Sequence, residues 1–146
     1  DGFNAPDRAR DIASAMYAGG ADIVYHAAGG SGAGLFEAAK ATSDESGTKV
    51  WAIGVDSDQY NTSDAAVKEF ILTSMLKRVD VAVYEIIKAH IEGKVVGGPT
   101  AYNLSVDGVG YATSGGFVDD IVADLDAFKA KIISGEIVVP TDPAQA

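Results

Sequence analysis

The sequence predicts an α/β domain built on a parallel sheet. A β-favouring run at 23–26 leads directly into four glycines between Gly29 and Gly34, and helix-forming residues follow. A second apolar run, at 50–55, ends in Asp56. A strand, a helix and a second strand form a βαβ unit, whose nearly invariant right-handed crossover implies parallel strands. The length of 146 residues, with 47% hydrophobic and 22% charged, suits one domain with a buried core.

The first half of the chain alternates helices and strands. Asn4 is expected to cap a helix that begins near Pro6 and ends at Gly19 and Gly20, because apolar residues recur between them at helical spacing. A strand at 22–26, a helix at 32–42 and a strand at 50–55 follow. Residues 57–64 are expected to form a loop, before a short helix and a third strand at 70–75.

The second half predicts an amphipathic helix over 79–92. Its apolar residues form one stripe, namely Val79, Val83, Ile86, Ile87, His90 and Ile91. Beyond a linker at 94–100, we expect a strand at 101–106, a last helix from Val118 to about Ile132 and a short strand at 137–139.

Charge and composition exclude several classes of function. The net charge of −10 and the scattered basic residues argue against nucleic acid and anionic membrane surfaces as partners. The chain has no cysteine and two histidines, so we expect no disulfide, thiol chemistry or metal site. No apolar run approaches ~18 residues, the length that spans a membrane. Because the chain opens on Asp1 without a methionine or a signal peptide, we expect a processed or truncated product.

Four features are candidates for a small polar ligand. The turn around Gly29 and Gly30 brings bare backbone and a helix N-terminus close to a ligand. Asp56 follows a buried strand, where a carboxylate can accept hydrogen bonds from two vicinal hydroxyls. Lys77 follows the third strand and can donate to the same sugar. Phe3 can stack on a base. Each also has a purely structural interpretation: a packing turn, a solvated acid, a surface lysine and a core aromatic.

No catalytic residue is expected. His26 ends its strand without a G-x-S-x-G motif, and both it and His90 are interpreted as structural. The turn lacks the Gly-Lys-Ser/Thr of a P-loop. Its glycines, at 30, 32 and 34, are out of register with G-x-G-x-x-G, but a dinucleotide site with Asp56 on a ribose diol stays open as an alternative.

Four segments resemble the basic membrane protein family, the substrate-binding lipoproteins of ABC transporters that include purine nucleoside receptors. They are GADIVYHAAGGSGAGLF (20–36), AIGVDSDQ (52–59), LTSMLKRVD (72–80) and GVGYATSGGF (108–117), in the family's order. The resemblance implies the type 1 periplasmic-binding-protein fold, in which two α/β lobes joined by a hinge close on a ligand. It also implies that Phe3 stacks on the base, Gly29 and Gly30 offer backbone groups, and Asp56 and Lys77 hold the ribose hydroxyls.

The same resemblance implies that this chain is the C-terminal lobe of a receptor about twice as long. Residues 1–77 would form the ligand-binding lobe, 78–100 the hinge crossing and a helix of the absent N-terminal lobe, and 101–146 the return to the first lobe. The protein would be extracytoplasmic, anchored by a lipid on the absent N-terminus, and would deliver a nucleoside, of the purine class, to an ABC permease without cofactor or catalysis.

Two consequences follow from the absent lobe. The apolar stripe of the helix at 79–92 should be covered by a second copy, by a retained N-terminal lobe or by rearranged packing, because leaving such side chains in water forgoes about 1.5 to 3 kcal/mol each. The fragment alone should bind a nucleoside weakly. Two alternatives stay open, a fragment of a dinucleotide-binding oxidoreductase and a ligand-free sensory or interaction module.

Overall fold

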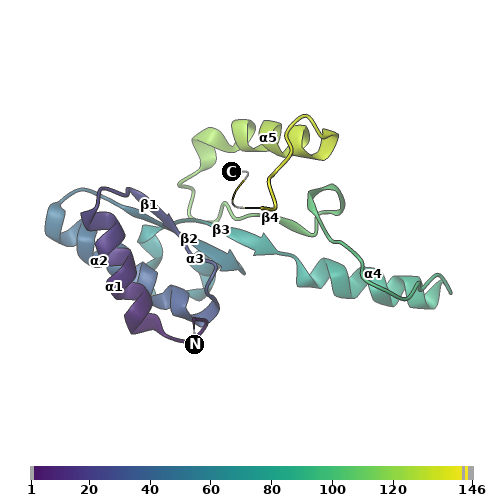
Figure 1. Ribbon diagram of the computed structural model, residues 1–146, viewed down its shortest axis with the longest axis horizontal. Coiled ribbons are helices and arrows are strands. Elements are labelled where there is room, and N and C mark those ends of the chain that lie inside the picture. Colours follow the sequence, from purple (N-terminus) through teal and green to yellow (C-terminus); the bar gives the residue numbers. More distant parts are fainter. Residues whose placement is uncertain (1, 143, 145–146) are drawn as a thin grey trace. The chain divides into compact units, whose positions relative to one another are not determined.

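The computed structural model describes residues 2–142 and residue 144 (Figure 1). Contacts divide them into two compact units. The first holds the residues up to Lys77 together with Gly110–Val118, and the second holds Arg78–Val109 and the residues from Asp119 onward. The α/β class expected from the sequence is confirmed.

The sheet has four strands in the order β1 (Ile23–Tyr25), β2 (Trp51–Asp56), β3 (Ile71–Lys77) and β4 (Val109–Tyr111). β1 and β3 both pair with β2 in the parallel direction, with Tyr25 opposite Ile53 and Asp56 opposite Leu76. The predicted βαβ unit is therefore present, and the carboxyl ends of β1, β2 and β3 meet at one edge of the sheet.

Helices α1 (Pro6–Ala18) and α2 (Gly32–Ser46) lie side by side in the first unit (Figure 1). Their contact requires glycine at position 34, where an added Cβ would lie 1.8 Å from the carbonyl oxygen of Pro6. The short helix α3 (Gln59–Thr62) falls inside the stretch expected to be a loop, and a 3-10 turn at Lys68–Phe70 follows it. The loop prediction for 57–64 was wrong in this respect.

Asn4 does not cap α1. The N-cap residue is Ala5, whose side chain makes no capping bond. The backbone N–H of Ala5 instead donates to Oγ of Ser31 at 2.9 Å, and that hydroxyl donates to the carbonyl oxygen of Gly2 at 2.6 Å. The start of α1 is thus bound to the glycine turn, a long-range contact that local capping rules do not foresee.

The hydrophobic core lies between these helices and the sheet. Its buried members are Ala13, Tyr17, Leu35, Phe36, Ala38, Ala39, Val50, Ala52 and Ile71. Tyr17 donates a hydrogen bond from its hydroxyl to the carbonyl oxygen of Trp51 at 2.8 Å, and burial raises the pKa of Tyr17 to about 12.

The second unit contains α4 (Val79–Ile91), a 3-10 turn at Leu104–Val106, another at Asp119–Ile121 and α5 (Val122–Ser134). The strand predicted at 101–106 was wrong, because the side chain of Asn103 accepts the backbone N–H of Ser105 at 3.0 Å and turns the chain.

The strand predicted at 137–139 was also wrong. These residues have no strand assignment. The N–H of Ile137 donates instead to the carbonyl oxygen of Lys131 at 3.1 Å, at the end of α5. A strand needs a partner strand for its backbone, and the chain following a helix end can satisfy that end instead.

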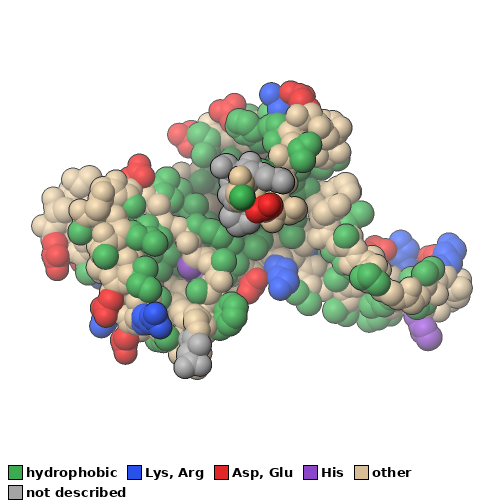
Figure 2. Space-filling model, in the orientation of Figure 1, with side chains coloured by type: hydrophobic (Ala, Val, Ile, Leu, Met, Phe, Trp, Pro, Cys, Tyr) green, Lys and Arg blue, Asp and Glu red, His purple; other side chains and the backbone are tan. Residues whose placement is uncertain are grey.

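α4 has the predicted amphipathic stripe but no buried residue. Val79, Val83, Ile86, Ile87 and Ile91 are 47–79% exposed, and green hydrophobic side chains are visible along this helix in Figure 2. The described residues of the second unit therefore do not cover the stripe by rearranged packing. Among the described residues, no helix has the length and apolar character needed to cross a membrane.

Candidate functional site

Asp56 and Lys77 lie at the same edge of the sheet. Each is the last residue of its strand, and Asp56 is in register with Leu76, one position before Lys77. Both side chains are exposed. Within 2–142 and 144 the carboxylate of Asp56 makes no hydrogen bond or ion pair, with Lys77 or any other residue. The edge therefore presents one acid and one amine to solvent, each without a bonding partner in the described chain.

Asp56 adopts a left-handed backbone conformation, with φ of 68°. The N–H of Ser57 donates to the carbonyl oxygen of Val55 at 2.9 Å, which closes a three-residue γ-turn around Asp56. A non-glycine residue in this region is strained by about 1–3 kcal/mol, and such strain clusters at functional sites. Sequence patterns give no sign of it.

The neighbouring Asp58 differs in its contacts. Its carboxylate accepts hydrogen bonds from Nδ2 of Asn61, at 2.7 Å, and from the hydroxyl of Ser114. Asp58 is therefore occupied in fixing the loop after β2, and Asp56 is the acid available to a ligand.

Phe3 lies against the glycine turn. A Cβ added at Gly29 would sit 3.4 Å from the carbonyl oxygen of Phe3 and 3.5 Å from its ring carbon Cδ1, and one added at Gly30 would lie 3.4 Å from the same oxygen. Gly29 has φ of 53°, which favours glycine, and the Phe3 side chain is 73% exposed. The structure thus places an exposed aromatic ring beside a turn of bare backbone.

His26 is buried under the turn, as the structural interpretation expected. It is 7% exposed, its ring lies edge-on to Phe36 at 5.5 Å, and its Nε2 is 3.0 Å from Oε1 of Gln59. Burial lowers the pKa of His26, against the opposing effects of the Gln59 hydrogen bond and the charge of Asp56. The side chain of His90 is exposed on α4, and its structural interpretation stays a prediction.

Gln59 is the residue that sequence reasoning missed. It is the first residue of α3, and its side chain bonds to His26 and to the backbone of Val55. The only sequence signal is its position, three residues after the acid that ends β2.

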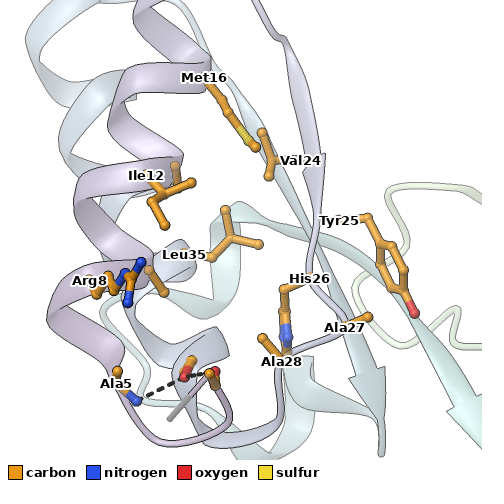
Figure 3. Close-up of a pocket in the computed structure, with 14 residues that line it drawn as sticks. Ala5, Arg8, Ile12, Met16, Val24, Tyr25, His26, Ala27, Ala28 and Leu35 are labelled. Carbon is orange, nitrogen blue, oxygen red and sulfur yellow. Dashed lines mark hydrogen bonds between the residues drawn. The ribbon is translucent and has the colours of Figure 1, made fainter.

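The structure contains an apolar groove between α1 and β1, with a volume of about 440 Å³ (Figure 3). Apolar side chains line most of it, and Arg8, Tyr25, His26 and small residues complete the lining, which includes none of the five candidate residues. β1 is the end strand of the described sheet, so this groove suits an apolar segment of protein better than a polar ligand.

A second hollow, of about 610 Å³, lies beside the glycine turn. Gly29, Gly30 and Gln59 line it, together with residues from Thr62 to Val67. Asp56 and Lys77 face solvent outside both hollows. In the described part of the chain, no three His, Cys, Asp or Glu side chains are grouped to hold a metal ion.

Comparison with protein families decides the class of this chain. The sequence model of the Bmp family, described as ABC transporter substrate-binding protein PnrA-like, matches residues 1–143. The chain belongs to the Bmp family. The resemblance stated from the sequence motifs is confirmed.

Relatives in this family cover the chain almost fully. The chain is 39% identical over 149 residues to an ABC transporter nucleoside-binding protein, BmpA, of Lactococcus lactis. The matched region covers 95% of this chain and 42% of the relative. It is 37% identical over 149 residues to a CD4+ T-cell-stimulating antigen of Listeria monocytogenes, and this match covers 97% of this chain and 42% of the relative. The chain thus spans less than half the length of these relatives.

A solved structure shares the fold. The crystal structure of an ABC transporter system solute-binding protein from Aeropyrum pernix K1 matches with a TM-score of 0.70 and 29% identity, over 97% of this chain and 47% of that one. The α/β architecture described above is therefore one found in about half of a solute-binding protein.

Proposed function

We propose that this chain is the C-terminal lobe of an extracytoplasmic receptor that captures a nucleoside, of the purine class, for uptake by an ABC transporter. The Bmp family comprises substrate-binding proteins, and a relative that is 39% identical is named as nucleoside-binding. Family membership favours this interpretation over a dinucleotide-dependent oxidoreductase. The lobe carries out no bond-making chemistry and acts by holding the ligand.

The observation that carries the proposal is the edge where β1, β2 and β3 end. Asp56 accepts hydrogen bonds from two ribose hydroxyls, and Lys77, one register position away on β3, donates to the same sugar. Phe3 stacks on the base, where one stacked base contributes about 1–3 kcal/mol. Gly29 and Gly30 offer backbone groups at a turn that lies against Phe3.

The second unit supports the proposal that the chain is one part of a two-lobed protein. The units divide between Lys77 and Arg78, where we expect the hinge crossing, and α4 leaves its apolar stripe exposed. We propose that the N-terminal lobe covers this stripe, with a second copy of the chain as the alternative. That lobe also supplies most base-reading contacts, a lipid anchor and part of the surface that meets the permease.

The proposal is tested by calorimetry on the full-length receptor. Asp56→Asn should weaken binding of inosine or guanosine by about 1.5–3 kcal/mol, the contribution of charged hydrogen bonds. Asp22→Asn, the same charge change just before β1 at the opposite sheet edge, should leave the affinity unchanged. Equal affinities for the wild type and the Asp56 variant would reject Asp56 as a ligand residue.

The glycine turn has its own matched control. Gly29 and Gly47 both have positive φ, 53° and 68°, so alanine at either position strains the backbone. Gly47 ends α2, away from the ligand edge, and only Gly29→Ala should reduce nucleoside affinity. Protection of the receptor against heat by NAD(H), without any effect of inosine or guanosine, would favour the oxidoreductase alternative.

A further inference from the structure

We infer that Gln59 is the positioning residue of the ribose-binding edge: its side-chain oxygen fixes the backbone that presents Asp56 and joins it to the glycine turn. This inference rests on the proposed function, since it assigns to Gln59 the placement of the acid that binds the sugar.

The contacts of Gln59 connect three strands. Its Oε1 accepts the backbone N–H of Val55, on β2, at 2.8 Å and lies 3.0 Å from Nε2 of His26, which directly follows β1. Its own backbone N–H donates to Oγ of Ser74, on β3, at 3.1 Å. Gln59 thereby bonds to three segments of the sheet. One leads to the glycine turn, one leads to Asp56 and one leads to Lys77.

The hydrogen bonds have an unambiguous direction. A backbone N–H can only donate, so the Gln59 atom that faces Val55 is the carbonyl oxygen and not the amide nitrogen. The same oxygen therefore accepts from His26, whose proton lies on Nε2. The buried Nδ1 of His26 has no partner among the described residues, which agrees with a neutral ring.

The surrounding residues leave room for this arrangement. A Cβ at Gly54 would lie 2.7 Å from Oε1 of Gln59 and 2.6 Å from Oγ of Ser74, and a Cβ at Gly32 would lie 2.1 Å from the ring of His26. Ser74 and His26 are 0% and 7% exposed. The partners of Gln59 are thus buried and closely packed, and glycine occupies the two positions where any side chain would displace them.

The position of Val55 makes the network relevant to the ligand. The carbonyl of Val55 closes the γ-turn around Asp56, and its N–H is the group that Gln59 holds. Removing the acceptor leaves buried donors on Val55 and His26 unpaired, so the strained turn can relax and move the carboxylate.

The test compares two ligands on the full-length receptor, a ribonucleoside and its 2′,3′-dideoxy analogue. Gln59→Met removes the acceptor at similar size, and we expect a loss of about tenfold or more for the ribonucleoside, with little change for the analogue. Gln59→Glu keeps an acceptor oxygen and should restore most of the preference. Glu45→Met, which also replaces a polar side chain by methionine but lies exposed near the end of α2, away from the ligand edge, is the control.

A purely structural role would give a different result. If Gln59→Met weakens both ligands equally, or leaves the preference for ribose intact, the inference is wrong. Should Gln59→Met fail to fold, Gln59→Asn replaces it, because that side chain is one methylene shorter and its oxygen falls short of Val55; loss of the ribose preference supports the inference and its retention overturns it.

Hydrogen exchange separates this inference from the proposed function. In the ligand-free receptor, Gln59→Met should speed exchange of the Val55 amide relative to the Trp51 amide, which donates to the carbonyl oxygen of Asp22. If the wild type binds no nucleoside, the proposed function fails, and the exchange result alone decides whether Gln59 fixes this backbone. Unchanged protection of Val55 would overturn the inference in either case.

Discussion

The two units of this chain use apolar residues in opposite ways. Every buried hydrophobic side chain in the described part of the chain belongs to the first unit, on α1, α2, the sheet, the residue just before β2 (Val50) or Gly110–Val118. In the second unit, α4 and α5 have no buried residue. Both units contain amphipathic helices, so the difference lies in whether the described residues of the same unit offer a surface for the apolar side of the helix.

The helical spacing of apolar residues therefore identifies the face of a helix that is to be buried, but not the surface that covers it. The first unit brings α1 and α2 onto its own sheet. The stripe of α4 stays in water, and full burial of each such side chain would contribute about 1.5–3 kcal/mol. We therefore expect the first unit to account for the stability of the isolated chain.

The largest expected effect is in the core of the first unit. Leu35 is 2% exposed, so Leu35→Ala should lower the free energy of unfolding by about 2–5 kcal/mol, through lost burial and the cavity left behind. Ile87→Ala on α4, where the side chain is 54% exposed, should change it by less than about 0.5 kcal/mol in the isolated chain. Urea unfolding of both variants measures the contrast, and equal losses would contradict it.

The same Ile87→Ala change should behave differently in the full-length protein. If the N-terminal lobe covers α4, the substitution should lower stability there by about 2 kcal/mol or more, as for other buried isoleucines. Urea unfolding of the full-length wild type and variant measures this. An effect as small as in the isolated chain would mean that the lobe does not cover α4, and sedimentation would then show whether a second copy does.

Helix packing in the first unit gives the next effect. Gly34→Ala places a methyl group against the backbone of Pro6 and should lower stability by about 1–3 kcal/mol. Gly110→Ala is the control, because an added Cβ at position 110 would meet nothing within 4 Å. Thermal unfolding of the two variants should separate them, and a neutral Gly34→Ala would mean that α1 and α2 can separate without loss.

The pH dependence of stability should report His26. Burial lowers the pKa of His26 in the folded protein, so the unfolded chain binds the proton more readily. The neutral ring stabilises the fold above pH ~6.5, and this contribution is lost as pH falls below that value, by at most about 1.4 kcal/mol per pH unit. Urea unfolding at pH 7 and pH 5 should show the loss in the wild type and in His90→Gln, whose ring is exposed. If His26→Asn lost as much stability between pH 7 and pH 5 as the wild type, His26 would not be the cause of the loss.

The smallest expected effect concerns Lys49. Its Nζ lies 4.1 Å from the ring centre of Trp51 and 4.6 Å from that of Phe117. Lys49→Gln should lower stability by about 0.5–1 kcal/mol and change the emission of the single tryptophan. Lys94→Gln, at an exposed lysine that pairs with Glu92 and lies over no aromatic ring in the described part of the chain, should do neither. Identical fluorescence of the wild type and Lys49→Gln would show that Lys49 does not interact with the ring of Trp51.

Local patterns predicted most of the first unit and less of the second. The strands predicted at 50–55 and 70–75 stop one and two residues before β2 and β3 end, at Asp56 and Lys77, and the helices follow from apolar periodicity. The strands expected at 101–106 and 137–139 failed because short β-favouring runs need a partner strand, and hydrogen bonds within nearby turns and helix ends took their backbone groups instead. The prediction that Asn4 caps α1 was wrong, because the hydroxyl of Ser31, distant in sequence, accepts the N–H of Ala5.

The α/β class, the parallel βαβ unit and the family could all be predicted from the amino-acid sequence, because they depend on periodicity, glycine placement and motifs along the chain. The left-handed conformation of Asp56 and the bonds of Gln59 to His26 and Val55 become visible in the folded chain alone. Those features depend on strand register and on hydrogen bonds between residues far apart in sequence, and no local pattern encodes which distant group will arrive at a given backbone N–H.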